Sequence, residues 1–88
     1  MDGADEPRIV WRGPVPVYLQ VADILRRRIR KGQLGPDDRL PSETELIELY
    51  GVGRKTARSA IKVLRDEGLV YTVEHRGTYV AGTTRPEG

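Results

Sequence analysis

The stretch GVGRKTARSAIKVL (residues 51–64) decides the fold, because it predicts a short turn followed by an amphipathic helix over residues 54–67. Four apolar side chains recur at the spacing of one helical face: Ala57, Ala60, Ile61 and Leu64. The amino end of a helix carries partial positive charge and normally favours Asp or Glu, yet this helix starts with Arg54 and Lys55. A docked anion would offset that unfavourable arrangement. The sequence therefore predicts that a polyanion binds at the start of this helix.

A shorter helix is predicted immediately before the turn. Ser42 and Glu45 have the spacing of a capping box, in which each side chain accepts a hydrogen bond from the backbone N–H of the other residue. Gly51 fits the left-handed residue that commonly ends a helix. The expected inward face of this helix consists of Leu46, Leu49 and Tyr50.

An earlier helix is predicted over residues 16–31 and stops at Gly32. Its apolar stripe of helical period consists of Tyr18, Val21, Ala22, Leu25 and Ile29. Residues 32–41 have the composition of a loop, which we expect to be anchored to the core by Leu34 and Leu40. The segment IVW (residues 9–11) is consistent with a short strand or with an apolar plug on the core, and we favour the plug.

Beyond Gly68 the chain has a β-like composition. LVYTV (residues 69–73) and TYVAG (residues 78–82) are rich in β-branched and aromatic residues, and EHRG (residues 74–77) supplies a turn, so a hairpin is expected. A hairpin placed after two helices that share a short turn forms the wing of a helix-turn-helix. The predicted fold class is mainly α with a small β-hairpin (α+β), a winged helix-turn-helix with three helices and a two-stranded wing.

The chain of 88 residues is long enough for one small domain, which we place at residues 9–81. Residues 1–8 are expected to form a disordered N-terminal tail, and residues 82–88 a tail or a linker to an absent effector domain. With one His, no Cys and no clustered acid pair, the sequence predicts no enzyme, no metal site and no cofactor. No apolar run approaches the roughly 18 residues of a membrane span, so we expect no membrane association and a cytoplasmic location.

Charge is segregated between the two helices that flank the turn. Residues 43–50 contain three acidic residues and no basic one, whereas residues 53–65 contain five basic residues and no acidic one. This pattern indicates that only the second of these helices faces an anion.

The motifs together resemble the DNA-binding domain of the GntR family of bacterial transcription regulators. They are LPSETEL (residues 40–46), VGRKT (52–56), Arg58, EGLV (67–70) and GTYV (77–80), and the resemblance covers residues 16–81. The opening PVYLQV (residues 16–21) is more similar to the HutC-like and YtrA-like branches than to the fatty-acid-responsive branch.

The resemblance implies sequence-specific binding to double-stranded DNA by a repressor, with the helix 54–67 in the major groove. The wing at 74–77 would contact the flanking backbone or minor groove. It also implies a palindromic operator and a homodimer, formed on DNA or through a C-terminal domain that is missing here. A small-molecule effector is expected only if the full protein has an effector domain.

Thirteen residues are expected to contact DNA: Ser42, Thr44, Gly53, Arg54, Lys55, Thr56, Arg58, Ser59, Lys62, His75, Arg76, Gly77 and Thr78. Arg58 is the leading base reader, since a guanidinium can donate two hydrogen bonds to O6 and N7 of guanine. Gly53 leaves backbone N–H groups free for a phosphate. Arg65 is expected to be a phosphate contact or plain surface.

Three of these residues depart from the family pattern. Thr44 stands where many members have a basic residue, and Gly53 stands where Ser or Thr usually caps the recognition helix. His75 stands where the wing tip usually has Gly, so the backbone there is expected to differ.

Two other binding modes compete with the reading of duplex DNA. The first is a winged-helix protein–protein interaction module, but a protein-docking face normally offers aromatic or aliphatic anchors and this helix offers cations. The second is base stacking of single strands on aromatic side chains. We expect the aromatic residues to pack in the core or at its edge instead, namely Trp11, Tyr18, Tyr50, Tyr71 and Tyr79.

Overall fold

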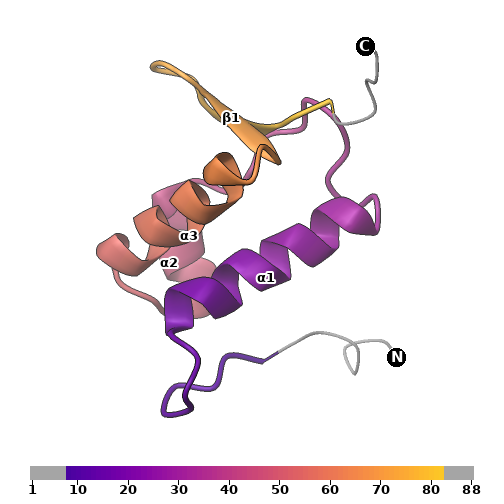
Figure 1. The fold of residues 1–88 in the computed structure, drawn as a ribbon. Coiled ribbons are helices and arrows are strands. Elements are labelled where there is room, and N and C mark those ends of the chain that lie inside the picture. Colours follow the sequence, from indigo (N-terminus) through magenta and orange to yellow (C-terminus); the bar gives the residue numbers. More distant parts are fainter. Residues whose placement is uncertain (1–7, 83–88) are drawn as a thin grey trace.

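Three helices and a β-hairpin follow one another along the chain in the computed structural model, which describes residues 8–82 (Figure 1). They are α1 (Val17–Arg30), α2 (Glu43–Tyr50), α3 (Arg54–Asp66), β1 (Val70–Val73) and β2 (Gly77–Val80). The predicted winged helix-turn-helix is therefore confirmed, and each helix ends within a residue of its expected boundary. The predicted tails at 1–8 and 82–88 lie outside the described residues, except for Arg8 and Gly82.

The start and end of α2 follow the expected local chemistry. The Glu45 N–H donates to Ser42 Oγ at 3.1 Å, and the Ser42 N–H donates to Glu45 Oε1 at 2.8 Å, which completes the capping box. Gly51 then ends the helix in the left-handed region, with φ of 69°. The turn brings α3 alongside α2, the arrangement of a helix-turn-helix.

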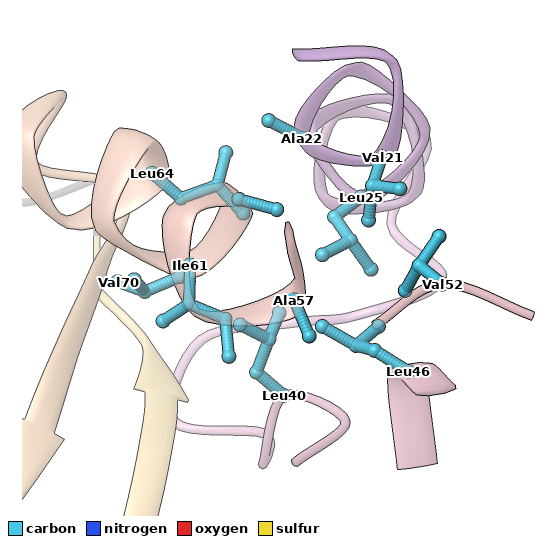
Figure 2. Packing of buried hydrophobic residues seen from close by; sticks show 11 residues of the cluster. Val21, Ala22, Leu25, Leu40, Leu46, Val52, Ala57, Ile61, Leu64 and Val70 are labelled. Carbon is cyan, nitrogen blue, oxygen red and sulfur yellow. The ribbon is translucent and has the colours of Figure 1, made fainter. Parts of the chain in front are cut away.

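One hydrophobic core joins the three helices to the base of the wing. Figure 2 shows side chains of α1, α3 and the segments around α2 that point toward one another. The expected inward face of α3 is buried throughout, and most of the stripe of α1 is buried with it. The buried cluster includes Val21, Ala22, Leu25, Leu40, Leu46, Val52, Ala57, Ala60, Ile61, Leu64 and Val70.

The wing is an antiparallel hairpin whose register places Val73 opposite Gly77. Gly77 thus belongs to β2 and not to the turn, and the expected strand at 78–82 is displaced to 77–80. The three-residue turn is closed by the Arg76 N–H, which donates to the Val73 carbonyl at 3.0 Å. At its tip, His75 has φ of 66°, so it takes the left-handed conformation that Gly normally provides.

Residues 37–40, expected as loop, run along β2 as an additional edge segment. The Asp37 N–H donates to the Val80 carbonyl at 2.7 Å, and the Leu40 N–H donates to the Thr78 carbonyl at 2.8 Å. Arg39 forms an isolated antiparallel bridge with Tyr79. These hydrogen bonds fix the wing to the segment that enters α2.

The prediction that Leu49 faces inward is wrong, because 56% of Leu49 is exposed. Leu46 fills the core position alone on α2, with Ile47 and Tyr50 packed against the core at its edges. Leu49 instead lies at a surface hollow beside Leu34 and Pro41. A helix of only eight residues has too few turns for its pattern to define one inward face.

The apolar plug at residues 9–11 is only partly correct. Ile9 packs against the core, but Val10 and Trp11 are each 57% exposed, so Trp11 is not the core or edge residue expected of it. The Gln20 side chain accounts for this placement. Its amide pairs with the N–H and the carbonyl of Val10 at 2.7 and 2.9 Å and also donates to the Val15 carbonyl at 2.8 Å.

Among residues 8–82, no helix has the length and apolar character that a membrane span requires. The tyrosines of the wing pack on each other, as expected for edge residues. The rings of Tyr71 and Tyr79 stack with their centroids 5.8 Å apart, and the Tyr71 hydroxyl donates to Asp37 Oδ1 at 2.7 Å.

Candidate nucleic-acid interface

The solvent-facing side of α3 carries a row of cations, because the opposite side of the helix is fixed in the core by its alanines and leucine. All five basic side chains of the helix are exposed: Arg54, Lys55, Arg58, Lys62 and Arg65. The first turn contains no acidic residue, and no side chain caps it at Gly53. No side chain therefore occupies the backbone N–H groups of this first turn, where an anion would be favoured.

Glu43, the first residue of α2, lies between the two leading arginines of α3. Arg58 Nε donates to Glu43 Oε2 at 3.2 Å, and Arg54 Nη1 donates to Glu43 Oε1 at 3.3 Å. The hydrogen bond from Arg58 is the largest of the effects that lower the pKa of Glu43 below its ordinary value, and Arg54 adds to it. In the protein without DNA, this carboxylate supplies part of the missing negative charge.

Sequence reasoning missed Glu43 as a site residue. An acidic residue in the first turn of a helix is explained by that helix's own dipole, so nothing in the local pattern pointed to a second role. The contact also modifies the expectation that the acidic helix faces away from the anion. Glu43 of α2 lies beside the cations of α3 and orients two of them.

Replacing Glu43 with Gln is expected to raise the affinity for random duplex and to reduce the preference for the operator sequence. The first effect follows from the loss of a negative charge near phosphates, and the second from the loss of the acceptor that orients Arg54 and Arg58. Fluorescence anisotropy with operator and random duplexes at one salt concentration measures both. Glu48→Gln, an exposed acid on the same helix, is the matched control. Equal changes in the two variants would contradict an orienting role for Glu43.

The space between the start of α2, the outer side of α3 and the base of the wing forms a surface hollow of about 240 Å³. It brings together four of the predicted site residues, namely Ser42, Arg58, Gly77 and Thr78. Three lining residues that the sequence did not single out are Arg39, Glu43 and Thr72. Arg65 also lines this hollow, and its Nη1 donates to Thr72 Oγ1 at 3.1 Å.

The remaining predicted site residues lie around this hollow without joining it. Thr44 is exposed on α2, and Lys62 pairs with Asp66 one turn along α3 at 2.8 Å. His75 and Arg76 are exposed at the wing tip. The other five are Gly53 and four residues of α3. Gly53, Arg54 and Lys55 are exposed, and Thr56 and Ser59 are half-buried. Within the described part of the chain, no three His, Asp or Glu side chains gather as ligands for a metal.

Known proteins match this chain in sequence. NagR, a transcriptional repressor of Bacillus subtilis, is 43% identical over 70 residues, which cover 80% of this chain and 29% of NagR. The histidine utilization repressor of Klebsiella aerogenes is 38% identical over 78 residues, covering 89% of this chain and 31% of that protein. The chain thus spans less than a third of the length of these relatives.

Solved structures match its fold. The DNA-binding domain of AraR in complex with operator ORX1 has a TM-score of 0.76 and 39% identity, covering 82% of this chain and 93% of that one. YtrA of Sulfolobus acidocaldarius, a GntR-family transcription factor, has a TM-score of 0.77 and 36% identity, covering 88% and 81%. The expected likeness to the HutC-like and YtrA-like branches is confirmed.

The family model described as bacterial regulatory proteins, gntR family, matches residues 17–80. That range begins with the first residue of α1 and ends with the last residue of β2, so it includes all five elements of the fold. The chain belongs to the GntR family of bacterial regulatory proteins.

Proposed function

We propose that this domain binds double-stranded DNA sequence-specifically and serves as the DNA-reading part of a bacterial transcription repressor. The observation that carries the proposal is the exposed cationic side of α3, which begins with Arg54 and Lys55 beside an uncapped helix start. The AraR domain, of similar fold, is bound to an operator in its structure, and NagR and the histidine utilization repressor are named as repressors. These relatives support the proposal for this chain.

In the proposed complex, α3 lies in the major groove and reads bases through its arginines. Glu43 occupies Arg58 Nε, which leaves both terminal nitrogens of that guanidinium to donate to O6 and N7 of one guanine. Arg54 has Nη1 on Glu43 and keeps Nε and Nη2 for a second guanine or a phosphate. One carboxylate therefore fixes two arginines while leaving each a pair of donors.

The flanks of α3 position the domain on the DNA backbone. The open N–H groups after Gly53 face a phosphate, and Lys55, Thr56 and Thr44 add contacts nearby. The wing tip carries His75 and Arg76 into the adjacent minor groove or onto its phosphates. A bound protein occludes the DNA from polymerase, which is how a repressor acts.

A palindromic operator would hold two copies of the domain related by a two-fold axis. Dimerisation would then occur on DNA or through a further C-terminal domain, and a small-molecule effector would act through such a domain. Because the target is chromosomal DNA, the proposal places the protein in the cytoplasm and gives it no enzymatic step.

The direct test is selection of bound duplexes from a random pool, followed by affinity measurements at several salt concentrations. We expect one enriched motif and a linear fall of log affinity with log salt, because phosphate contacts release counterions. Random duplex should bind more weakly than the enriched duplex by roughly 10³-fold or more at equal salt. A pool without enrichment, together with salt-insensitive binding, would favour a protein-docking winged helix instead.

A further inference from the structure

We propose that the hollow between α2, α3 and the wing is a seat for one backbone phosphate of the bound DNA, with Arg39 and Arg65 as its cationic walls. This inference rests on the proposed function. It extends that function to Arg39, which is outside the predicted contact set, and it assigns Arg65 the phosphate contact that was one of its two expected roles. The ligand is a phosphodiester oxyanion, and its two non-bridging oxygens suit the forked donors of arginine.

The hollow is lined by more positive than negative charge, which favours binding of an anion. Three guanidiniums line it, those of Arg39, Arg58 and Arg65, against the single carboxylate of Glu43. Both oxygens of that carboxylate are already engaged by arginines of α3. Within residues 8–82, neither Arg39 nor Arg65 forms an ion pair, and Glu45 offsets the charge of Arg39 only at longer range. The hollow therefore keeps net positive charge.

Arg39 is held in place by β2 at two points, its backbone and its guanidinium. Its own backbone bridges to Tyr79 on β2, and its guanidinium lies against Gly77. A Cβ at Gly77 would stand 3.1 Å from Arg39 Nε, so a side chain there would require the guanidinium to shift by a few tenths of an ångström. Gly77 also has φ of 132°, a region that disfavours other residues. The wing therefore provides a flat surface on which Arg39 rests.

Hydroxyl groups complete the floor of the hollow. Thr72 Oγ1 and Thr78 Oγ1 lie 3.3 Å apart across the hairpin, and Thr72 accepts a hydrogen bond from Arg65. Ser42 Oγ accepts from the Glu45 N–H in the capping box, which leaves the Ser42 hydroxyl proton available to donate. Hydroxyl donors beside arginines are typical of phosphate contacts on DNA.

The position of the hollow identifies the ligand as backbone and not base. The hollow lies between α2, α3 and the base of the wing. In the proposed complex, α3 enters the major groove and the wing reaches the flanking groove. A DNA strand separates these two grooves, so its phosphates pass between the two elements. The guanidinium of Arg39, on the edge segment beside β2, and that of Arg65, near the end of α3, can therefore meet at one phosphate.

The test uses Arg39→Gln, Arg65→Gln and the double variant on the enriched duplex, with Arg30→Gln on the exposed end of α1 as the charge-matched control. Each site variant is expected to weaken binding roughly tenfold, the size of one charge-assisted hydrogen bond. The double variant should lose less than the product of the two, because both side chains hold the same phosphate. The shared seat would be overturned if either single variant weakened binding no more than Arg30→Gln does. It would also be overturned if the affinity loss of the double variant equalled the product of the two single losses.

A second arm replaces single phosphates of the duplex with uncharged methylphosphonates. At one position the unmodified protein should lose roughly tenfold in affinity, while the double variant should lose nothing further. Two results would overturn the proposal. In the first, no methylphosphonate lowers the affinity of the unmodified protein. In the second, every methylphosphonate is tolerated and inorganic phosphate shifts the NMR signals of the Arg39 and Arg65 side chains. That last result would assign the hollow to a free anion. Failure of the proposed function itself is distinguishable, because the unmodified protein would then select no duplex.

Discussion

Arg58→Ala is expected to abolish discrimination at one base pair of the operator while preserving discrimination at the others. The lost pair of hydrogen bonds to guanine is worth about 1 to 3 kcal/mol, which corresponds to a roughly 5- to 150-fold weaker affinity for the preferred base. The fold should be unaffected, since the Arg58 side chain is 68% exposed and its contact with Glu43 is a surface ion pair. Selection of duplexes by the variant, compared base by base with the unmodified protein, measures the effect.

Lys62→Ala is the matched control for this variant, because Lys62 lies one turn further along the same side of α3 and pairs only with Asp66 among the described residues. A lysine that contacts phosphate contributes to all sequences alike, so its loss should weaken every duplex and flatten the salt dependence. Uniform weakening by Arg58→Ala would contradict its role as a base reader and assign it to the backbone.

Leu46→Ala is expected to lower the free energy of unfolding by about 2 to 5 kcal/mol. Leu46 is fully buried and is the only buried residue of α2, a helix of eight residues that is too short to persist without packing. Small domains lie at the low end of the usual 5 to 15 kcal/mol of stability, so this change should leave much of the population unfolded. Urea denaturation followed by circular dichroism measures the free energy of unfolding.

Leu49→Ala provides a control of identical chemistry on the same helix. Because Leu49 is 56% exposed, its truncation should change the free energy of unfolding by no more than about 0.5 kcal/mol. Leu46→Ala should also weaken DNA binding more than Leu49→Ala does, because detachment of α2 would remove Glu43 from the arginines of α3. Equal destabilisation by the two variants would contradict the described packing of α2.

The parts of the fold that the sequence predicts well are those set by local chemistry. The capping box of Ser42 and the left-handed Gly51 define α2, and the helical spacing from Ala57 to Leu64 defines the buried side of α3. The same periodicity places the cations of α3 on its outer side. Each of these features depends on residues a few positions apart, which is the range over which sequence patterns are informative.

The parts that the sequence does not predict depend on contacts between distant segments. Glu43 meets Arg58 across 15 positions, and Arg39 reaches Gly77 from a segment that reads as loop. Trp11 is exposed because Gln20 binds the backbone beside it, a contact that composition cannot indicate. The two residues that complete the candidate site, Glu43 and Arg39, thus become evident only when the wing and α2 are brought against α3.

The most direct measurement of the central claim is a titration of the isotope-labelled protein with the enriched duplex, monitored by NMR at low and at high salt. Binding through the cationic start of α3 predicts that the amide signals of Gly53 to Arg58 and the guanidinium signals of Arg54 and Arg58 shift first, and that high salt reverses the shifts. Signals of α3 that stay unmoved by duplex at low salt, while those of another surface shift, would contradict it.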